Sequence, residues 1–241
     1  MKKGIYLATM VLLVFSAAAQ DSTAGKPKKS ALDLSNRAND HLLIQFGMAG
    51  WTGTPDTINQ SGFSKAFNLY LMFDFPFKSN PRLSMALGAG IGNDHIRFTK
   101  TDIGIKKVGS TLPFTNTADT NHFEKTKLAT TYLEIPVEFR FSADPLNVKG
   151  LKAAIGIKAG TLIDAHTRNS KYQNRSGNSL GDFTVKESGR RYFNRTRIVA
   201  TARVGYGRLS LFGSYQLTNV FKDGQGPAVR TWALGIALSG L

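Results

Sequence analysis

Charged side chains alternate with apolar or glycine residues in several segments of the sequence. Glu134 and Glu138 lie four residues apart, so both side chains point to the same face of an extended strand. Buried charges are tolerated when they pair, so such a set can form a plug of ion pairs or line a polar channel. We expect a plug; a channel would favour anions, because the set holds more cations than carboxylates. The set comprises Asp74, Glu134, Glu138, Arg140, Lys152, Lys158, Arg195, Arg197 and Arg203.

His95 and His166 are the residues best suited to acid–base chemistry. His95 follows Asp94, and His166 lies two residues after Asp164. A rim hydrolase acting on lipid A or peptides could use such residues, but no serine lies at a telling offset and no metal-ligand spacing occurs. The chain contains no cysteine, which excludes cysteine catalysis and disulfides. We therefore expect no enzymatic activity, no catalytic residue, no metal and no cofactor.

The elements that must position these residues have a side-chain period of two, which is typical of β-strands. Eight such segments occur, at 42–51, 66–77, 83–97, 128–141, 151–166, 193–206, 209–218 and 230–239. In the two clearest segments one face is apolar and free of charge, and we expect it to contact lipid. Its residues are Phe67, Leu69, Leu71, Phe73, Phe75, Leu133, Ile135, Val137 and Phe139. Aromatic residues near segment ends fit the girdles of a membrane interface: Trp51, Phe77, Phe141, Tyr206 and Trp232.

The breaks between segments alternate in length, which is typical of outer-membrane barrels. Short breaks lie at 78–82, 142–150 and 206–208, and longer ones at 52–64, 98–127, 167–192 and 219–229. The pattern predicts an all-β fold: an eight-stranded antiparallel transmembrane β-barrel with short periplasmic turns and long extracellular loops. A soluble β-sandwich or a lipocalin-like barrel also has many short strands. Both are disfavoured, because charge gathers on the glycine-rich face, which suits a narrow lumen.

The termini and the net charge indicate where the chain acts. Lys2 and Lys3 precede an apolar stretch and an Ala17-x-Ala19 site, so we expect a signal peptide over 1–19 with cleavage after Ala19. Residues 20–39 are polar and predict a periplasmic tail, followed by the barrel over 40–241. The formal charge is +15, but export and the scatter of the basic residues exclude nucleic acid as the partner we expect.

Basic residues are frequent in the predicted outer loops, where they either contact lipopolysaccharide or a partner or are simply solvated. They are Lys100, Lys106, Lys107, Lys125, Lys127, Arg168, Lys171, Arg175, Lys186, Arg190 and Arg191. We expect outer-membrane lipid and lipopolysaccharide to be partners of the chain.

Three segments resemble the PorT-like outer-membrane β-barrel proteins. The segment Tyr132-Leu133-Glu134-Ile135-Pro136-Val137 is the most specific, and 87–92 and 215–221 are similar to further strands of that family. The resemblance covers roughly residues 40–241. It implies an eight-stranded barrel, no cofactor, no established enzymatic activity, and secretion-system proteins as partners, since one member belongs to the type IX secretion system. The sequence therefore predicts a non-enzymatic outer-membrane barrel with a structural or docking role. A narrow anion-favouring pore is the alternative, and a rim hydrolase is the least favoured.

Overall fold

The computed structural model describes residues 41–60, 63–147 and 149–240. The predicted signal peptide and periplasmic tail lie outside these residues. Within them the regular structure consists of strands, and no helix is long and apolar enough to cross a membrane. The strands are β1 (Leu42–Thr52), β2 (Lys65–Pro76), β3 (Leu83–Phe98), β4 (Thr101–Ile103), β5 (Phe114–Asn116), β6 (His122–Ser142), β7 (Leu151–Gln173), β8 (Ser179–Ser188), β9 (Thr196–Tyr206), β10 (Leu209–Gln216) and β11 (Arg230–Ser239).

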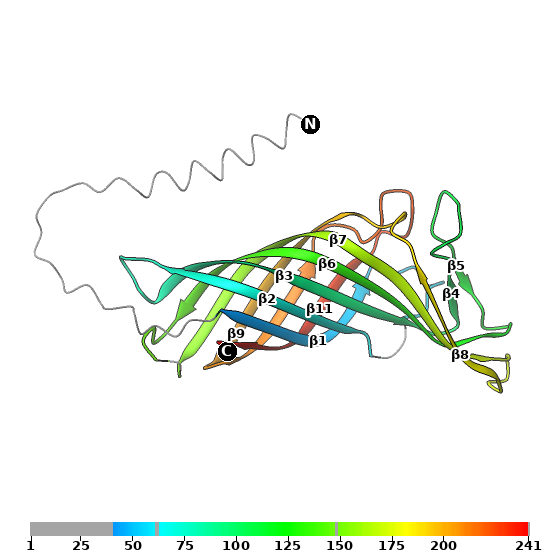
Figure 1. Cartoon of the computed structure of the whole chain (residues 1–241), viewed down its shortest axis with the longest axis horizontal. Coiled ribbons are helices and arrows are strands. Elements are labelled where there is room, and N and C mark those ends of the chain that lie inside the picture. Colours follow the sequence, from blue (N-terminus) through cyan, green and yellow to red (C-terminus); the bar gives the residue numbers. More distant parts are fainter. Residues whose placement is uncertain (1–40, 61–62, 148, 241) are drawn as a thin grey trace, which may run out of the picture. The chain divides into compact units, whose positions relative to one another are not determined.

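Eight of the described strands pair in a closed ring, and every pairing is antiparallel (Figure 1). The order around the ring is β6-β3-β2-β1-β11-β10-β9-β7, and β7 pairs back onto β6. Strand β8 pairs with the far part of β7, and β4 and β5 form a separate two-stranded sheet. The all-β, antiparallel prediction is confirmed. Closure leaves these strands without unpaired edges, which hydrocarbon would not tolerate.

The ring buries its polar and glycine-rich face and exposes its apolar face. Along β2, buried Ala66, Asn68 and Tyr70 alternate with exposed residues such as Leu71 and Phe73, each 59% exposed. All nine residues predicted to face lipid are exposed. A soluble sandwich or lipocalin-like barrel has the opposite arrangement, with apolar side chains inside. The exposed belt therefore fits hydrocarbon as its surroundings.

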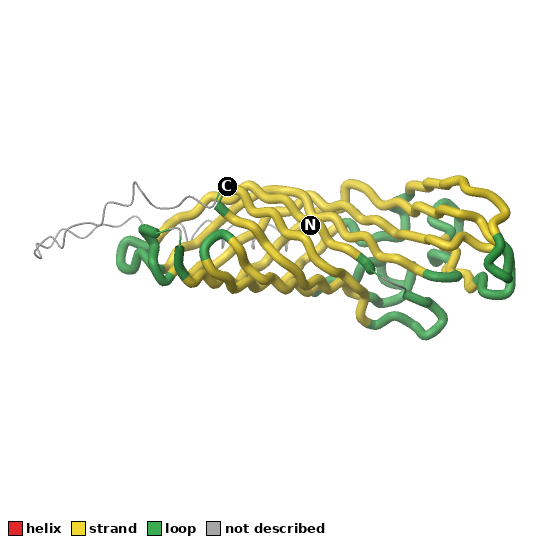
Figure 2. The backbone as a smooth tube through the Cα atoms, turned by 90° about the horizontal axis from the view of Figure 1, so that it is seen from below, coloured by secondary structure: helices red, strands yellow, loops and turns green. Residues whose placement is uncertain are grey.

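Figure 2 shows the strands running between loops at both ends of the ring. At one end the connections are 77–82, 143–150 and 207–208, and at the other they are 53–64, 99–121, 174–195 and 217–229. Strand β6 begins at residue 122 instead of 128, and β7 ends at residue 173 instead of 166. Strand β9 begins at residue 196 instead of 193. The extensions were missed because most of their residues on both faces are polar, so hydrophobic alternation does not mark them.

Aromatic residues from strand ends and from the longer connections form a hydrophobic cap at that end of the ring. Trp51 packs edge-on against Phe98, Phe114 and Phe221, with ring centroids 5.3–6.4 Å apart, and Phe193 contacts Phe221 at 5.1 Å. The prediction that Trp51 belongs to an interfacial girdle is wrong: it is 7% exposed, because odd-numbered residues of β1 point inward. The cap covers the interior at the end with the longer connections.

Candidate functional site

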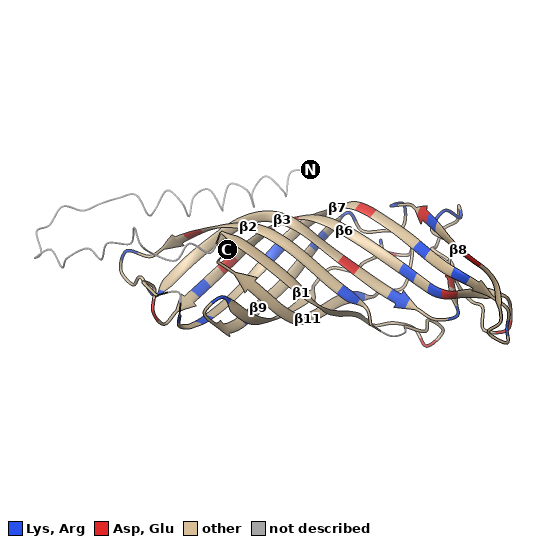
Figure 3. Ribbon diagram, turned by 60° about the horizontal axis from the view of Figure 1, so that its bottom comes forward, with Lys and Arg blue, Asp and Glu red and all other residues tan. Residues whose placement is uncertain are grey.

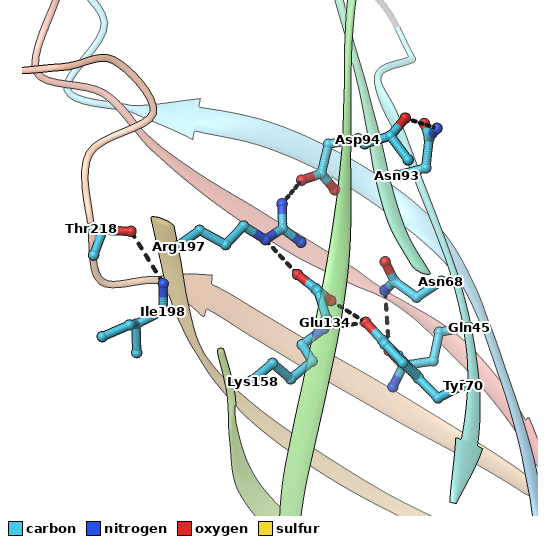
Figure 4. A network of polar contacts seen from close by, with 11 residues as sticks. Gln45, Asn68, Tyr70, Asn93, Asp94, Glu134, Lys158, Arg197, Ile198 and Thr218 are labelled. Carbon is cyan, nitrogen blue, oxygen red and sulfur yellow. Dashed lines mark hydrogen bonds and ion pairs between the residues drawn. The ribbon is translucent and has the colours of Figure 1, made fainter. Parts of the chain in front are cut away.

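The interior of the ring holds a buried charge network centred on Arg197 of β9 (Figure 4). Its Nε donates to Oε1 of Glu134 on β6 at 2.5 Å, and its Nη1 donates to Oδ2 of Asp94 on β3 at 2.5 Å. The side chains of Arg197, Glu134 and Asp94 are each at most 6% exposed. One guanidinium thus joins two carboxylates from two other strands. Charge-assisted bonds of this kind are stronger than neutral ones.

Two tyrosines and a lysine complete this upper tier of the network. The hydroxyl of Tyr70 donates to Oε2 of Glu134 at 2.5 Å and accepts a bond from Nζ of Lys158 at 3.2 Å. The Arg197 guanidinium lies 4.3 Å from the ring centroid of Tyr132, a cation–π distance. Both carboxylate oxygens of Glu134 therefore have donors, which is the condition for keeping a charge away from water.

Glycines make the room that Glu134 needs. A Cβ added at Gly92 would lie 2.6 Å from Oε2 of Glu134, and one added at Gly160 would lie 2.9 Å from its Cγ. Gly160 of β7 is paired directly with Glu134, and Gly92 of β3 lies two residues from Gly90, the direct partner of Glu134 on that strand. The alternation of glycine with larger residues in these strands is thus a requirement of the network.

A lower tier surrounds Glu138, four residues further along β6. Its Oε2 accepts from Nε of Arg140 at 2.9 Å and from Nη2 of Arg203 at 3.1 Å. Nη1 of Arg140 also lies 3.8 Å from Oδ1 of Asp74. A cavity of about 30 Å³ adjoins this tier near the short connections, and Lys152 is among its lining residues.

The charges inside the ring nearly balance. Four buried or nearly buried carboxylates face four buried cations, and the half-buried Lys152 lies at the edge of the network. The carboxylates are Asp74, Asp94, Glu134 and Glu138, and the cations are Arg140, Lys158, Arg197 and Arg203. The predicted excess of three cations falls to one, Lys152, for two reasons. Asp94 belongs to the network, and Arg195, which precedes β9, is exposed and lies outside it.

Seven of the nine residues predicted for the charge network lie in these two tiers. Three further members, Asp94, Tyr70 and Tyr132, were not predicted. The signal for Asp94 was present, because it continues the even-numbered inward face of β3 that starts at Ser84. It was interpreted instead as a partner of His95. Tyr70 and Tyr132 carry no charge, so the search for charged residues passed over them.

The histidine–aspartate pair lies on the outside of the ring, toward the end with the longer connections. Nδ1 of His166 is 2.6 Å from Oδ2 of Asp164, and the strand register places Ser188 of β8 directly opposite His166. No sequence pattern links this serine to His166, because the two residues are 22 positions apart. No hydrogen bond joins Ser188 to His166 among the described residues, so the nucleophile–base contact of a hydrolytic triad is missing. Within the same residues, no group of three His, Asp or Glu side chains could hold a metal ion.

Comparison with known proteins agrees with the ring, the exposed apolar belt and the polar interior. A search of curated proteins finds no match. The model of the outer membrane protein beta-barrel domain family matches residues 19–222, which include every strand of the ring except β11. This match covers most of the chain, and it agrees with the inverted burial of the strands. The chain belongs to the outer membrane protein β-barrel domain family, which is located in the outer membrane.

Proposed function

We propose that this barrel is a non-enzymatic outer-membrane component with a structural or docking role, and that its interior is sealed. The observation that carries the proposal is the nearly neutral, internally bonded charge network. Arg197, Glu134 and Glu138 each bind partners on other strands, so the network connects strands of the ring through its interior. Removing one member of a buried ion pair costs about 3–5 kcal/mol, so a passing ion would not easily displace these contacts.

The small volumes of the interior cavities also support a sealed barrel. The cavity beside Asp94, Lys158 and Arg197 is about 10 Å³, and the one beside Arg140 and Arg203 is about 30 Å³. A cavity of roughly 10–15 Å³ is needed to hold a single water. These spaces therefore suit one or two isolated waters, not a continuous aqueous path. The aromatic cap around Trp51 covers the outer end in addition.

Planar-bilayer recording tests the sealed barrel against the alternative of a narrow pore. We expect the folded protein to give no discrete conductance between −100 and +100 mV (roughly the range of cellular potentials). The Glu134→Gln and Arg203→Ala variants provide the comparison, since both alter the network without touching the loops. Discrete wild-type openings whose size or ion selectivity changes in these variants would establish the pore and refute the plug.

The docking role in secretion rests on the PorT-like segment Tyr132–Val137, in which Glu134 is the centre of the network. The test is a mild-detergent pull-down of the tagged protein from its native outer membrane, with partners identified by mass spectrometry. Secretion-system components in a stable ratio would support the role. Recovery of the barrel alone, together with normal secretion in a deletion strain, would refute it. The intact mass of the purified protein also tests the proposed cleavage after Ala19.

A further inference from the structure

Basic side chains form a continuous row on the outer wall, close to the end with the longer connections. Arg97 pairs with Lys127, Lys127 with Arg168, and Arg168 with Lys186, so the row crosses β3, β6, β7 and β8 without a gap. Directly opposed residues in antiparallel strands project from the same face. Three interstrand spacings give the row a length of roughly 14 Å. Figure 3 shows basic positions gathered on β6 and β7 toward β8.

The row carries little compensating negative charge. Among the described residues, Arg97, Lys127, Arg168 and Lys186 make no ion pair. Lys65 and Lys125 lie near Lys127, and of these two only Lys125 has a carboxylate partner, Glu124 at 3.7 Å. Lys127 lies beyond the apolar, membrane-spanning part of β6. Its partial burial and the neighbouring charges of Arg97, Arg168, Lys65 and Lys125 lower its pKa. Like charges held together repel, so the arrangement favours an anionic occupant.

The height of the row on the wall identifies the kind of anion. The exposed apolar belt on β6 runs from Phe141 to Leu133, and Thr131 follows it. Lys127 lies four residues beyond Thr131, which is roughly 13 Å along the strand and about 10 Å in height for a strand tilted by 40°. Lys127, in the middle of the row, is therefore above the hydrocarbon, at the level of lipid headgroups, and the belt below it is free to contact acyl chains.

An aromatic cluster lies next to the row and is independent of its charge. Phe123, Tyr172 and Phe183 contact one another with ring centroids 5.1–5.9 Å apart, and Phe183 is 49% exposed. Phe123 and Tyr172 pair across β6 and β7, further from the belt than the cations. Exposed aromatic faces stack on the C–H faces of sugar rings, whose hydrogens are slightly positive. Acyl chains, phosphates and sugars thus find matching surfaces in that order along the wall.

We propose that this surface, formed by Lys65, Arg97, Lys125, Lys127, Arg168 and Lys186 with Phe123, Tyr172 and Phe183, is a specific binding site for a phosphorylated glycolipid of the outer leaflet, lipopolysaccharide. The cations bind its phosphates, and the aromatic cluster contacts its saccharide. The site is independent of the proposed docking role, because it uses the outer wall and none of the interior residues.

Lipopolysaccharide binding to the folded full-length mature barrel in detergent micelles is the test, with native mass spectrometry counting bound molecules. The triple variant Arg97→Gln, Lys127→Gln, Arg168→Gln is compared with a control of equal charge change at the other end, Lys78→Gln, Arg82→Gln, Arg208→Gln. A basic side chain near an anionic surface contributes about one tenfold step at most, so the test variant should bind roughly 10- to 100-fold more weakly. The control variant should bind like the wild type.

Two further arms make the result specific. Phe183→Ala should weaken binding of lipopolysaccharide but leave binding of phosphorylated lipid A, which lacks the core saccharide, less affected. Enzymatically dephosphorylated lipopolysaccharide should bind the wild type as weakly as the intact form binds the triple variant. Equal losses in test and control variants, or unchanged binding after dephosphorylation, would overturn the proposal. The heat-dependent gel mobility of each variant shows that it is folded.

Discussion

Nε of Arg197 on β9 lies 2.5 Å from Oε1 of Glu134 on β6, and β7 separates these two strands in the ring. The pair therefore crosses the interior over the intervening strand, and both side chains are almost completely buried. Lys158 of β7 reaches the same place through the hydroxyl of Tyr70. The network thus joins strands that are not neighbours, which interstrand hydrogen bonds alone cannot do.

Replacing Glu134 with alanine should destabilise the folded barrel by about 3–5 kcal/mol, because Lys158 and Arg197 stay buried without the negative charge of Glu134 that compensates them. Urea-induced unfolding in micelles measures the change. Glu124→Gln is the matched control: Glu124 is 42% exposed and pairs with lysines at 3.7 Å, so its change should stay within about 0.5 kcal/mol. Equal effects of the two substitutions would contradict a structural network.

Gly92→Ala should destabilise the barrel by about 1–3 kcal/mol, because the new methyl group occupies the space of the Glu134 carboxylate. The displaced carboxylate would lose its contacts with Tyr70 and Arg197. Gly213→Ala is the control, since a Cβ at that position of β10 meets only Cδ1 of Leu234, at 3.7 Å. Thermal unfolding of the two variants in the same detergent provides the comparison. If Gly213→Ala lowers the unfolding temperature as much as Gly92→Ala, the loss of stability comes from replacing a glycine in a strand and not from displacing the Glu134 carboxylate.

Much of the ring could be predicted from the sequence, because a period of two separates an apolar face from a polar one. The same parity places Glu134, Glu138 and Arg203 inside. It fails where alternation carries no hydrophobic signal, as in the polar extensions of β6 and β7. It also fails at Arg195, which precedes its strand, so strand parity does not determine where it points.

The partners of the network residues were less predictable than their faces. Register decides which residues on different strands meet, and register depends on turn geometry and bulges. A bulge between Thr131 and Tyr132 shifts the pairing of β6 with β7, so that both Ile163 and Asp164 follow Leu162 on the outer side. Ser188 comes to lie opposite His166 only because of this pairing and that of β8.

Leu71→Lys tests whether the exposed belt contacts hydrocarbon. Leu71 is 59% exposed and lies in the middle of the apolar face of β2, so a lysine there should cost about 2–4 kcal/mol when the barrel is folded in a bilayer. Val108→Lys, in the connection between β4 and β5, is the control; Val108 is 83% exposed, and its change should be within about 0.5 kcal/mol. The measurement is reversible unfolding in lipid vesicles. A neutral Leu71→Lys variant would show that water, not lipid, surrounds this face.

The Asp164–His166–Ser188 arrangement gives the sharpest test of the proposal that the barrel is not an enzyme. The 2.6 Å contact between His166 and Asp164 orients the imidazole, but Ser188 makes no hydrogen bond with it in the described residues. A serine without a bonded base is a weak nucleophile. We expect the wild type, Ser188→Ala and His166→Ala to release fatty acid from lipid A, phospholipid and a fluorogenic ester at the same background rate. Ser170→Ala, a serine of β7 bonded to Thr184, serves as the control substitution. Wild-type hydrolysis that disappears in Ser188→Ala and His166→Ala but survives in Ser170→Ala would make the outer wall a catalytic site, because only a reacting serine–histidine pair produces that pattern.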